Sequence, residues 1–131
     1  MPIDAAGARG TILVFEDEEE VKTFISKALN TLGYSVILTG DGPSSLETFK
    51  VHQDIIKLVI LDLALPVMSG VAVYKKLRET DSDMPVILMT GYGIEDEGEG
   101  EVDGIEFSGL LRKPFNISEL AELVSKVIEP D

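Results

Sequence analysis

The sequence predicts an α/β fold in which helices cover both faces of a parallel sheet. Five short apolar segments of strand length follow one another from residue 11 onward, and segments of helical periodicity follow all but the fourth. The short segments are mostly apolar, as in LVILDLALPV at residues 58–67, where Asp62 is the single charged residue, and such runs are typical of parallel strands buried on both faces. The chain has 131 residues, of which 44% are hydrophobic, which is enough for one domain with a packed interior.

Local patterns place the individual elements. The strands are expected at residues 11–15, 34–39, 58–63, 85–90 and, more weakly, 107–111. Clear helices are expected after the first, second, third and fifth strands. In the first helix, apolar residues recur at helical spacing over residues 21–32, and Gly33 ends the helix. The third helix follows Gly70, and Asn116 and Glu119 have capping-box spacing at the start of the last helix.

The fourth helix should fall at residues 94–104, where the sequence IEDEGEGEVDG is unfavourable for helix. It holds six acids, three glycines and no base. Each Gly costs about 1 kcal/mol in a helix interior, and like charges four residues apart repel. A short, weak helix and a solvated loop both fit this composition, and we favour the loop.

Composition excludes several classes of protein. The net charge is −13 and Lys and Arg form no cluster, so we expect no direct binding to nucleic acid. No run of about 18 apolar residues occurs, so we expect no membrane span and a cytoplasmic location. The absence of Cys excludes disulfides and Cys-based zinc sites. Residues 1–10 lack the apolar region of a signal peptide and are expected to be a flexible lead-in to one domain over residues 11–129.

Side chains that can bind a metal or a phosphate follow four of the expected strands. Ligands bind at the carboxyl ends of the strands in open α/β sheets, so we expect these side chains to meet on one rim. They are Glu16 and Asp17 after the first strand, Asp62 at the end of the third, Thr90 at the end of the fourth and Lys113 after the fifth. Each alone suits an ordinary role such as a helix cap, but their joint placement favours a site. Residues 18–20, which are all Glu, are expected to complement the positive amino end of the first helix.

The residue types on this rim favour phosphoryl chemistry. Clustered carboxylates repel one another, and oxygen ligands without Cys or His indicate Mg²⁺, which is commonly shared with a phosphate. A metal beside Asp62 would offset the charge that develops if this carboxylate attacks a phosphoryl group. Thr90 would donate a hydrogen bond to one phosphoryl oxygen, and Lys113 would neutralise another.

Four segments resemble the response-regulator receiver domain of two-component signalling: ILVFEDE, LVILDLALPVMSG, PVILMTGYG and LLRKPF. The resemblance implies a flavodoxin-like, doubly wound sheet of five parallel strands in the order 2-1-3-4-5, with five helices. It implies a signalling phosphoacceptor rather than an enzyme, which takes a phosphoryl group from the phosphohistidine of a histidine kinase or a histidine phosphotransfer protein. An output domain or protein partner would contact the face formed by the fourth helix, the fifth strand and the fifth helix.

The resemblance also implies a role for each residue on the rim. Asp62 corresponds to the phosphoacceptor and Asp17 to a direct ligand of Mg²⁺. Glu16 corresponds to an acid that acts through a metal-bound water, although Asp is commoner at this position. Ala64 would offer its backbone carbonyl to the metal.

On the other side of the expected site, Thr90 corresponds to the switch hydroxyl and Lys113 to the lysine that contacts the phosphoryl group. The Lys113–Pro114 peptide bond is often cis in the family. Leu110 stands where the family usually has a Tyr or Phe that rotates with the Thr, and Leu has no ring to rotate. Ala64 cannot orient an attacking water and Tyr92 would partly cover the site, so we expect slow self-dephosphorylation.

Other classes of protein fit less well. A phosphatase of the haloacid dehalogenase type needs a second acid two residues after its nucleophile, where this chain has Ala64. A nucleotide-binding protein needs a Gly-rich or hydroxyl-rich loop after the first strand, where this chain has EDEEE. The remaining alternative is a pseudo-receiver, an interaction module that is never phosphorylated. His52 is expected to be a surface residue.

Overall fold

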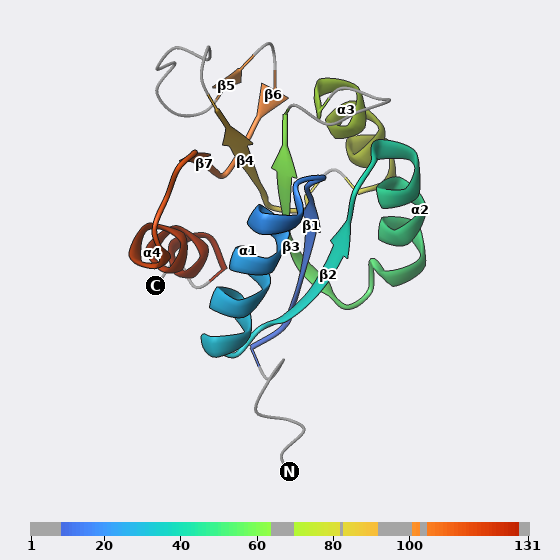
Figure 1. The fold of residues 1–131 in the computed structure, drawn as a ribbon. Coiled ribbons are helices and arrows are strands. Elements are labelled where there is room, and N and C mark those ends of the chain that lie inside the picture. The colour runs from blue at the N-terminus through green and yellow to red at the C-terminus, as the bar shows by residue number, and fades with distance from the viewer. Residues whose placement is uncertain (1–8, 64–69, 82, 92–100, 103–104, 129–131) are drawn as a thin grey trace.

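The computed structural model describes residues 9–63, 70–81, 83–91, 101–102 and 105–128. In this part of the chain, one sheet contains five parallel strands in the order β2-β1-β3-β4-β7 (Figure 1). The strands are β1 (Thr11–Phe15), β2 (Ser35–Thr39), β3 (Ile56–Asp62), β4 (Val86–Thr90) and β7 (Gly109–Arg112). Because β7 is the fifth strand of this sheet along the chain, the predicted order 2-1-3-4-5 is confirmed.

Among the described residues, two helices cover each face of the sheet (Figure 1). α1 (Glu19–Thr31) and α4 (Ile117–Ile128) lie on one face, and α2 (Gly42–His52) and α3 (Gly70–Thr80) lie on the other. None of the helices among the described residues is long and apolar enough to cross a membrane.

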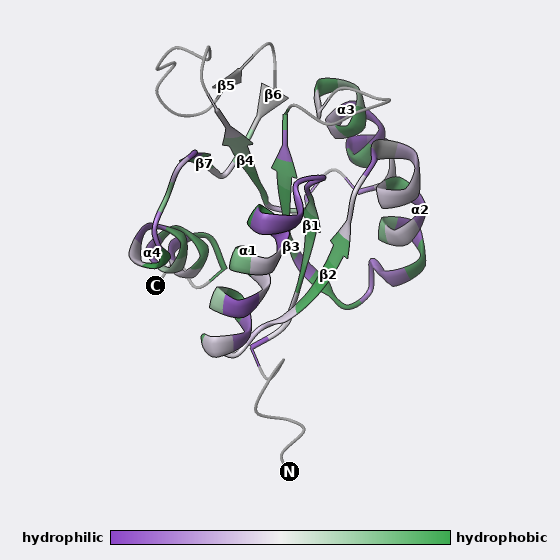
Figure 2. Ribbon diagram, viewed as in Figure 1, coloured by the Kyte–Doolittle hydropathy of each residue, from purple (hydrophilic) through white to green (hydrophobic). Residues whose placement is uncertain are grey.

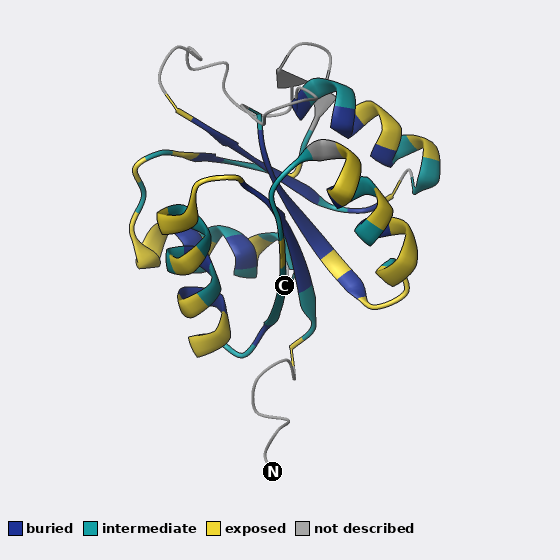
Figure 3. Cartoon of the chain, turned by 45° about the vertical axis from the view of Figure 1, so that its right-hand side comes forward, coloured by how far each residue is buried: buried dark blue, intermediate teal, exposed yellow. Residues whose placement is uncertain are grey.

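Successive residues of β1 point into separate cores on the two faces of the sheet. Ile12 and Val14 pack with residues of α1 and α4, whereas Leu13 and Phe15 pack with residues of α2 and α3. All four are fully buried. The central strands are therefore apolar and buried along most of their length, whereas the outer helix faces are polar and exposed (Figures 2 and 3). This confirms the prediction of strands buried on both faces for β1, β3 and β4, whereas the edge strands β2 and β7 are only partly buried.

Short-range signals fix the ends of the helices. α1 is followed by Gly33 with φ +103°, a conformation that favours glycine. At the start of α4, Asn116 Oδ1 accepts a hydrogen bond from Glu119 N (2.8 Å), and Glu119 Oε1 accepts one from Asn116 N (2.9 Å). The predicted capping box is therefore present.

The segment expected to hold the fourth helix is described only in part, since residues 94–100 and 103–104 lie outside the described residues. Its described residues form the strand β5 (Glu101–Val102), which pairs antiparallel with β6 (Ile105–Glu106). At residues 101–102 the chain is thus neither helix nor loop. The described residues contain four helices where the resemblance implied five. Strand pairing satisfies the backbone hydrogen-bonding groups of these residues.

The predicted lead-in over residues 1–10 falls mostly outside the described residues. Of its described residues, Arg9 contacts the fold, because its N–H donates a hydrogen bond to the carbonyl of Gly33 (3.0 Å). The Arg9 guanidinium also lies 5.4 Å from the centre of the Tyr34 ring.

Candidate functional site

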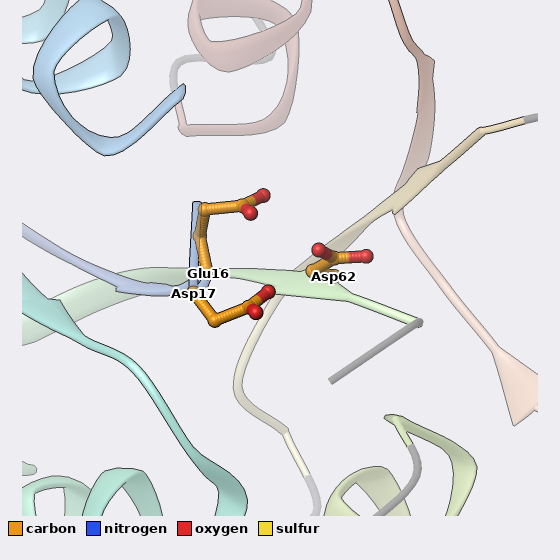
Figure 4. A group of neighbouring side chains, drawn as sticks. All are labelled: Glu16, Asp17 and Asp62. Carbon is orange, nitrogen blue, oxygen red and sulfur yellow. The ribbon is translucent and has the colours of Figure 1, made fainter. Parts of the chain in front are cut away.

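Three acids predicted from the sequence meet at the carboxyl ends of two neighbouring strands. Glu16 and Asp17 follow β1, and Asp62 is the last residue of β3. The two strands run in parallel with Phe15 opposite Leu61, so the residues that follow lie side by side. One carboxylate oxygen from each acid lies within 4.8 Å of the others (Figure 4).

The three acids differ in their exposure to solvent. Glu16 is 0% exposed and Asp62 is 3% exposed, whereas Asp17 is exposed. Burying two carboxylates next to each other is unfavourable unless positive charge compensates them. The cluster therefore needs cationic partners.

Lys113 supplies one such partner. Its Nζ lies 3.0 Å from Glu16 Oε1 and 3.2 Å from Asp62 Oδ2. The lysine follows β7, and its backbone N–H donates a hydrogen bond to the carbonyl of Thr90 (2.7 Å), which ties this loop to the end of β4. The Lys113–Pro114 peptide bond is cis, as the resemblance implied.

The side chain of Glu18 also reaches this lysine, a contact that no sequence pattern predicted. Glu18 Oε1 lies 3.2 Å from Lys113 Nζ. Glu18 stands in a run of acids and was expected to complement the amino end of α1 together with its neighbours. No local pattern distinguishes it from Glu19, which instead pairs with Lys22 at 3.0 Å.

The electrostatics of Glu16 and Lys113 follow from this arrangement. Burial raises the pKa of Glu16, and the charge of Asp62 acts in the same direction, while the Glu18 N–H and the ammonium partly oppose it. For Lys113, burial lowers the pKa, but the hydrogen bond to Glu16 and the charges of Asp62 and Glu16 outweigh this effect. The pKa of Lys113 is therefore raised, and the lysine stays charged.

Thr90 ends β4, the strand beside β3, and is 2% exposed. The register places Met89 opposite Asp62, so Thr90 lies one residue further toward the rim. Its Oγ1 is buried and has no hydrogen-bond partner among the described residues. A buried hydroxyl without a partner is costly, and it is suited to donate to an acceptor that enters the site.

Gly70 holds α3 close to the end of β3. The sequence predicted only that a helix follows Gly70 and did not indicate this contact. The Gly70 N–H donates a hydrogen bond to the carbonyl of Leu63 (3.1 Å). A Cβ at this position would lie 2.5 Å from Leu63 Cα and 2.9 Å from the carbonyl oxygen of Asp62. The absence of a side chain thus lets the helix pack directly on the backbone that carries Asp62.

Other predicted positions lie away from this cluster or outside the described residues. Ala64 and Tyr92 are outside the described residues. Leu110 lies in β7 and packs, partly buried, against the core on the α2–α3 face. His52 is exposed at the end of α2, as expected.

The fold is that of a signalling receiver domain. The sequence matches the family model of the response regulator receiver domain over residues 12–125, and the chain belongs to this family.

Relatives and solved structures agree with this assignment. An uncharacterized transcriptional regulatory protein of Bacillus subtilis, YkoG, is 37% identical over 114 residues, which are 86% of this chain and 48% of that protein. The sensor kinase CckA of Brucella abortus is 31% identical over 126 residues, or 96% of this chain and 13% of that protein. Among solved structures, this chain is similar to the receiver domain of the sensor histidine kinase PA1611 of Pseudomonas aeruginosa, which holds a magnesium ion in its active site cleft. The TM-score is 0.80 and the sequence identity is 26%, and the match covers 91% of this chain and 97% of that domain. The chain thus spans half or less of the length of these full-length relatives.

Proposed function

We propose that this chain is a phosphoacceptor whose Asp62 takes a phosphoryl group from a phosphohistidine with the help of Mg²⁺. One observation carries the proposal: Asp62 is a buried carboxylate that shares its surroundings with two further acids and an ammonium group. A carboxylate held in this way is a nucleophile beside groups that balance its charge.

The proposed transfer is a direct displacement at phosphorus. An oxygen of Asp62 attacks the phosphorus atom, a P–O bond forms, and the P–N bond of the phosphohistidine breaks. The electron pair of that bond returns to the imidazole nitrogen. The product on this chain is an acyl phosphate, and the donor is a histidine kinase or a histidine phosphotransfer protein.

The acids at the rim fit a hard divalent cation. Glu16, Asp17 and Asp62 offer oxygen ligands, and the ammonium of Lys113 balances only part of their charge. Asp17 is exposed and can bind a cation without being pulled out of a packed interior. When bound, Mg²⁺ would supply positive charge next to the phosphoryl oxygens. The backbone carbonyl of Ala64 and a water-mediated role for Glu16 remain predictions.

Lys113 and Thr90 would contact the phosphoryl group after its transfer to Asp62. The contact between Lys113 and Asp62 supports a role in which the ammonium pairs with a phosphoryl oxygen after transfer. The buried hydroxyl of Thr90 lacks a partner among the described residues, which supports its assignment as a donor to another phosphoryl oxygen.

The signal would pass to an output domain or a protein partner through a surface that includes β7 and α4. A hollow of about 580 Å³ lies between these elements, and its lining includes Leu110, Phe115 and Leu123. Since Leu110 offers no ring, we expect the output change to proceed without rotation of an aromatic side chain at this position. We expect the acidic segment over residues 94–104, most of which lies outside the described residues, to favour a basic partner.

Incubation with acetyl phosphate and Mg²⁺, followed by intact mass measurement, tests this function. We expect the wild type to gain the mass of one phosphoryl group, and we expect no gain in Asp62→Asn or after chelation of the metal. Asp54→Asn is the matched control, because Asp54 is an exposed residue outside the cluster. A wild type that gains no mass at saturating Mg²⁺ would instead identify the chain as a pseudo-receiver.

A further inference from the structure

Glu18 combines two local features that set it apart from the other acids of its run. It is the residue before α1, with φ −83° and ψ 122°, and its side chain makes no capping hydrogen bond to the helix. Its backbone N–H donates a hydrogen bond to Glu16 Oε2 (2.9 Å). The backbone therefore supports a buried acid of the site, while the side chain is left to interact elsewhere.

The Glu18 side chain occupies one of the donor directions of Lys113. An ammonium group has three N–H donors, and Lys113 Nζ lies 3.0 Å from Glu16, 3.2 Å from Glu18 and 3.2 Å from Asp62. The Glu18 side chain is 61% exposed, whereas those of Glu16 and Asp62 are 0% and 4% exposed. Glu18 is thus the partner that can exchange without opening the core.

The same carboxylate borders an opening next to the site. A hollow of about 420 Å³ is lined by Glu18 and Lys113 together with Phe24, Gly91 and Phe115, among others. A phosphodonor that reaches Lys113 through this hollow passes an exposed negative charge. At a separation of about 6 Å in water, a unit charge changes the local concentration of a dianion about tenfold.

We propose that Glu18 is a positioning residue that holds Lys113 in the resting state and disfavours small anionic phosphodonors. The inference rests on the proposed phosphoacceptor function and adds a selectivity to it. The carboxylate repels a free dianion such as acetyl phosphate, and it gives up its contact with Lys113 when a phosphoryl group on Asp62 takes that donor. Transfer itself forms and breaks the same bonds as before, because Glu18 does not touch the reacting atoms.

Glu18→Gln tests this role, because it removes the charge and keeps the size and an acceptor oxygen. We expect phosphorylation by acetyl phosphate at low donor concentration to become about three to ten times faster, mainly through a lower apparent KM. The gain should shrink at about 1 M salt, where the Debye length is about 3 Å. Mg²⁺ is held at saturation for each variant, as determined by its own titration.

Glu19→Gln is the matched control. It makes the same change of charge one residue away, but Glu19 pairs with Lys22 and is 84% exposed. We expect this variant, and Glu18→Asp, which keeps the charge, to stay within about twofold of the wild type. Affinity for fluoroberyllate, followed by fluorine NMR, gives a second measurement that requires no phosphoryl transfer, and it should rise in Glu18→Gln alone.

The outcomes separate the two proposals. A wild type that accepts phosphate, with Glu18→Gln no faster than Glu19→Gln, would overturn the role of Glu18 and leave the phosphoacceptor function in place. A slower Glu18→Gln would likewise overturn it, because Glu18 would then assist transfer. A wild type that accepts no phosphate would overturn both proposals.

Discussion

At the scale of single residues, this site concentrates negative charge in a buried position. Burial raises the pKa of Glu16, which means that folding disfavours its charged form. The same carboxylate is a candidate metal ligand. Stability of the fold therefore favours a neutral side chain at position 16, whereas metal binding favours the charged carboxylate.

Glu16→Gln should raise the free energy of unfolding of the metal-free protein by about 1 kcal/mol at pH 7. The amide keeps an acceptor for the Glu18 N–H and removes a buried charge. Below the ordinary pKa of 4.5, Glu16 is protonated in both the folded and unfolded states, so the advantage should be absent there and should appear as the pH rises through 4.5 toward the raised pKa. Urea unfolding at pH 4 and pH 7 measures this, and a destabilised variant at pH 7 would contradict it.

Lys113→Gln should lower the free energy of unfolding of the metal-free protein by about 2 kcal/mol, because it leaves buried carboxylates without their ammonium partner. Saturating Mg²⁺ should restore part of this loss, since a cation can replace the missing charge. Urea unfolding with and without Mg²⁺ provides the measurement. Lys50→Gln changes an exposed lysine of α2 and should have little effect under either condition.

Gly70→Ala should destabilise the protein by about 2 kcal/mol and slow phosphorylation, although Ala favours helix over Gly. The added Cβ would lie 2.5 Å from Leu63 Cα, so the strand end that carries Asp62 must shift. Gly91→Ala is the control next to the same site, because a Cβ there meets none of the described residues within 4 Å. Thermal unfolding and phosphorylation rates should separate the two variants; equal effects would contradict a role for close packing at Gly70.

At the scale of single elements, α4 illustrates how a local motif fixes a boundary. Its first turn is closed by reciprocal hydrogen bonds between Asn116 and Glu119. The helix then buries Leu120 and Val124 against the sheet. The capping box thus fixes the start of the helix only a few residues after Lys113 in the sequence.

Asn116→Ala should lower the free energy of unfolding by about 1 kcal/mol, because the backbone N–H of Glu119 loses its acceptor. Chemical denaturation gives this value directly. Ser118→Ala, at an exposed position of the same turn, should leave stability within about 0.5 kcal/mol of the wild type. An Asn116→Ala protein as stable as that control would show that the capping box contributes nothing.

At the scale of the whole molecule, the site exists because the sheet order places β1 between β2 and β3 and places β4 between β3 and β7. Side chains distant in sequence therefore reach one rim. The two cores, one on each face of the sheet, hold that rim in place. A cation bound at the rim should stabilise the entire fold, because its ligands come together only in the folded state.

Mg²⁺ at about one hundred times its dissociation constant should raise the free energy of unfolding of the wild type by about 2.7 kcal/mol. Asp17→Asn should abolish most of this increase and leave the metal-free stability nearly unchanged, because Asp17 is exposed. Urea unfolding at matched ionic strength measures both quantities. An equal Mg²⁺ response in the variant would exclude Asp17 as a ligand.

The sequence alone determined the alternation of strands and helices, the end of α1 at Gly33, the capping box and the acids at the strand ends. These features depend on residues a few positions apart, whose periodicity and backbone preferences can be read locally. The membership of the site could be predicted for Glu16, Asp17, Asp62 and Lys113, because each stands at the end of a strand.

Only the tertiary structure decided that Glu18 pairs with Lys113, that Gly70 packs on the end of β3, and that residues 101–102 pair as a strand. Glu18 and Lys113 are separated by 95 positions in the sequence. Their contact depends on the order of the strands and on the direction in which the chain leaves the sheet after β1 and after β7. No pattern among neighbouring residues contains that information, since the energy of such a contact is set by distance in space.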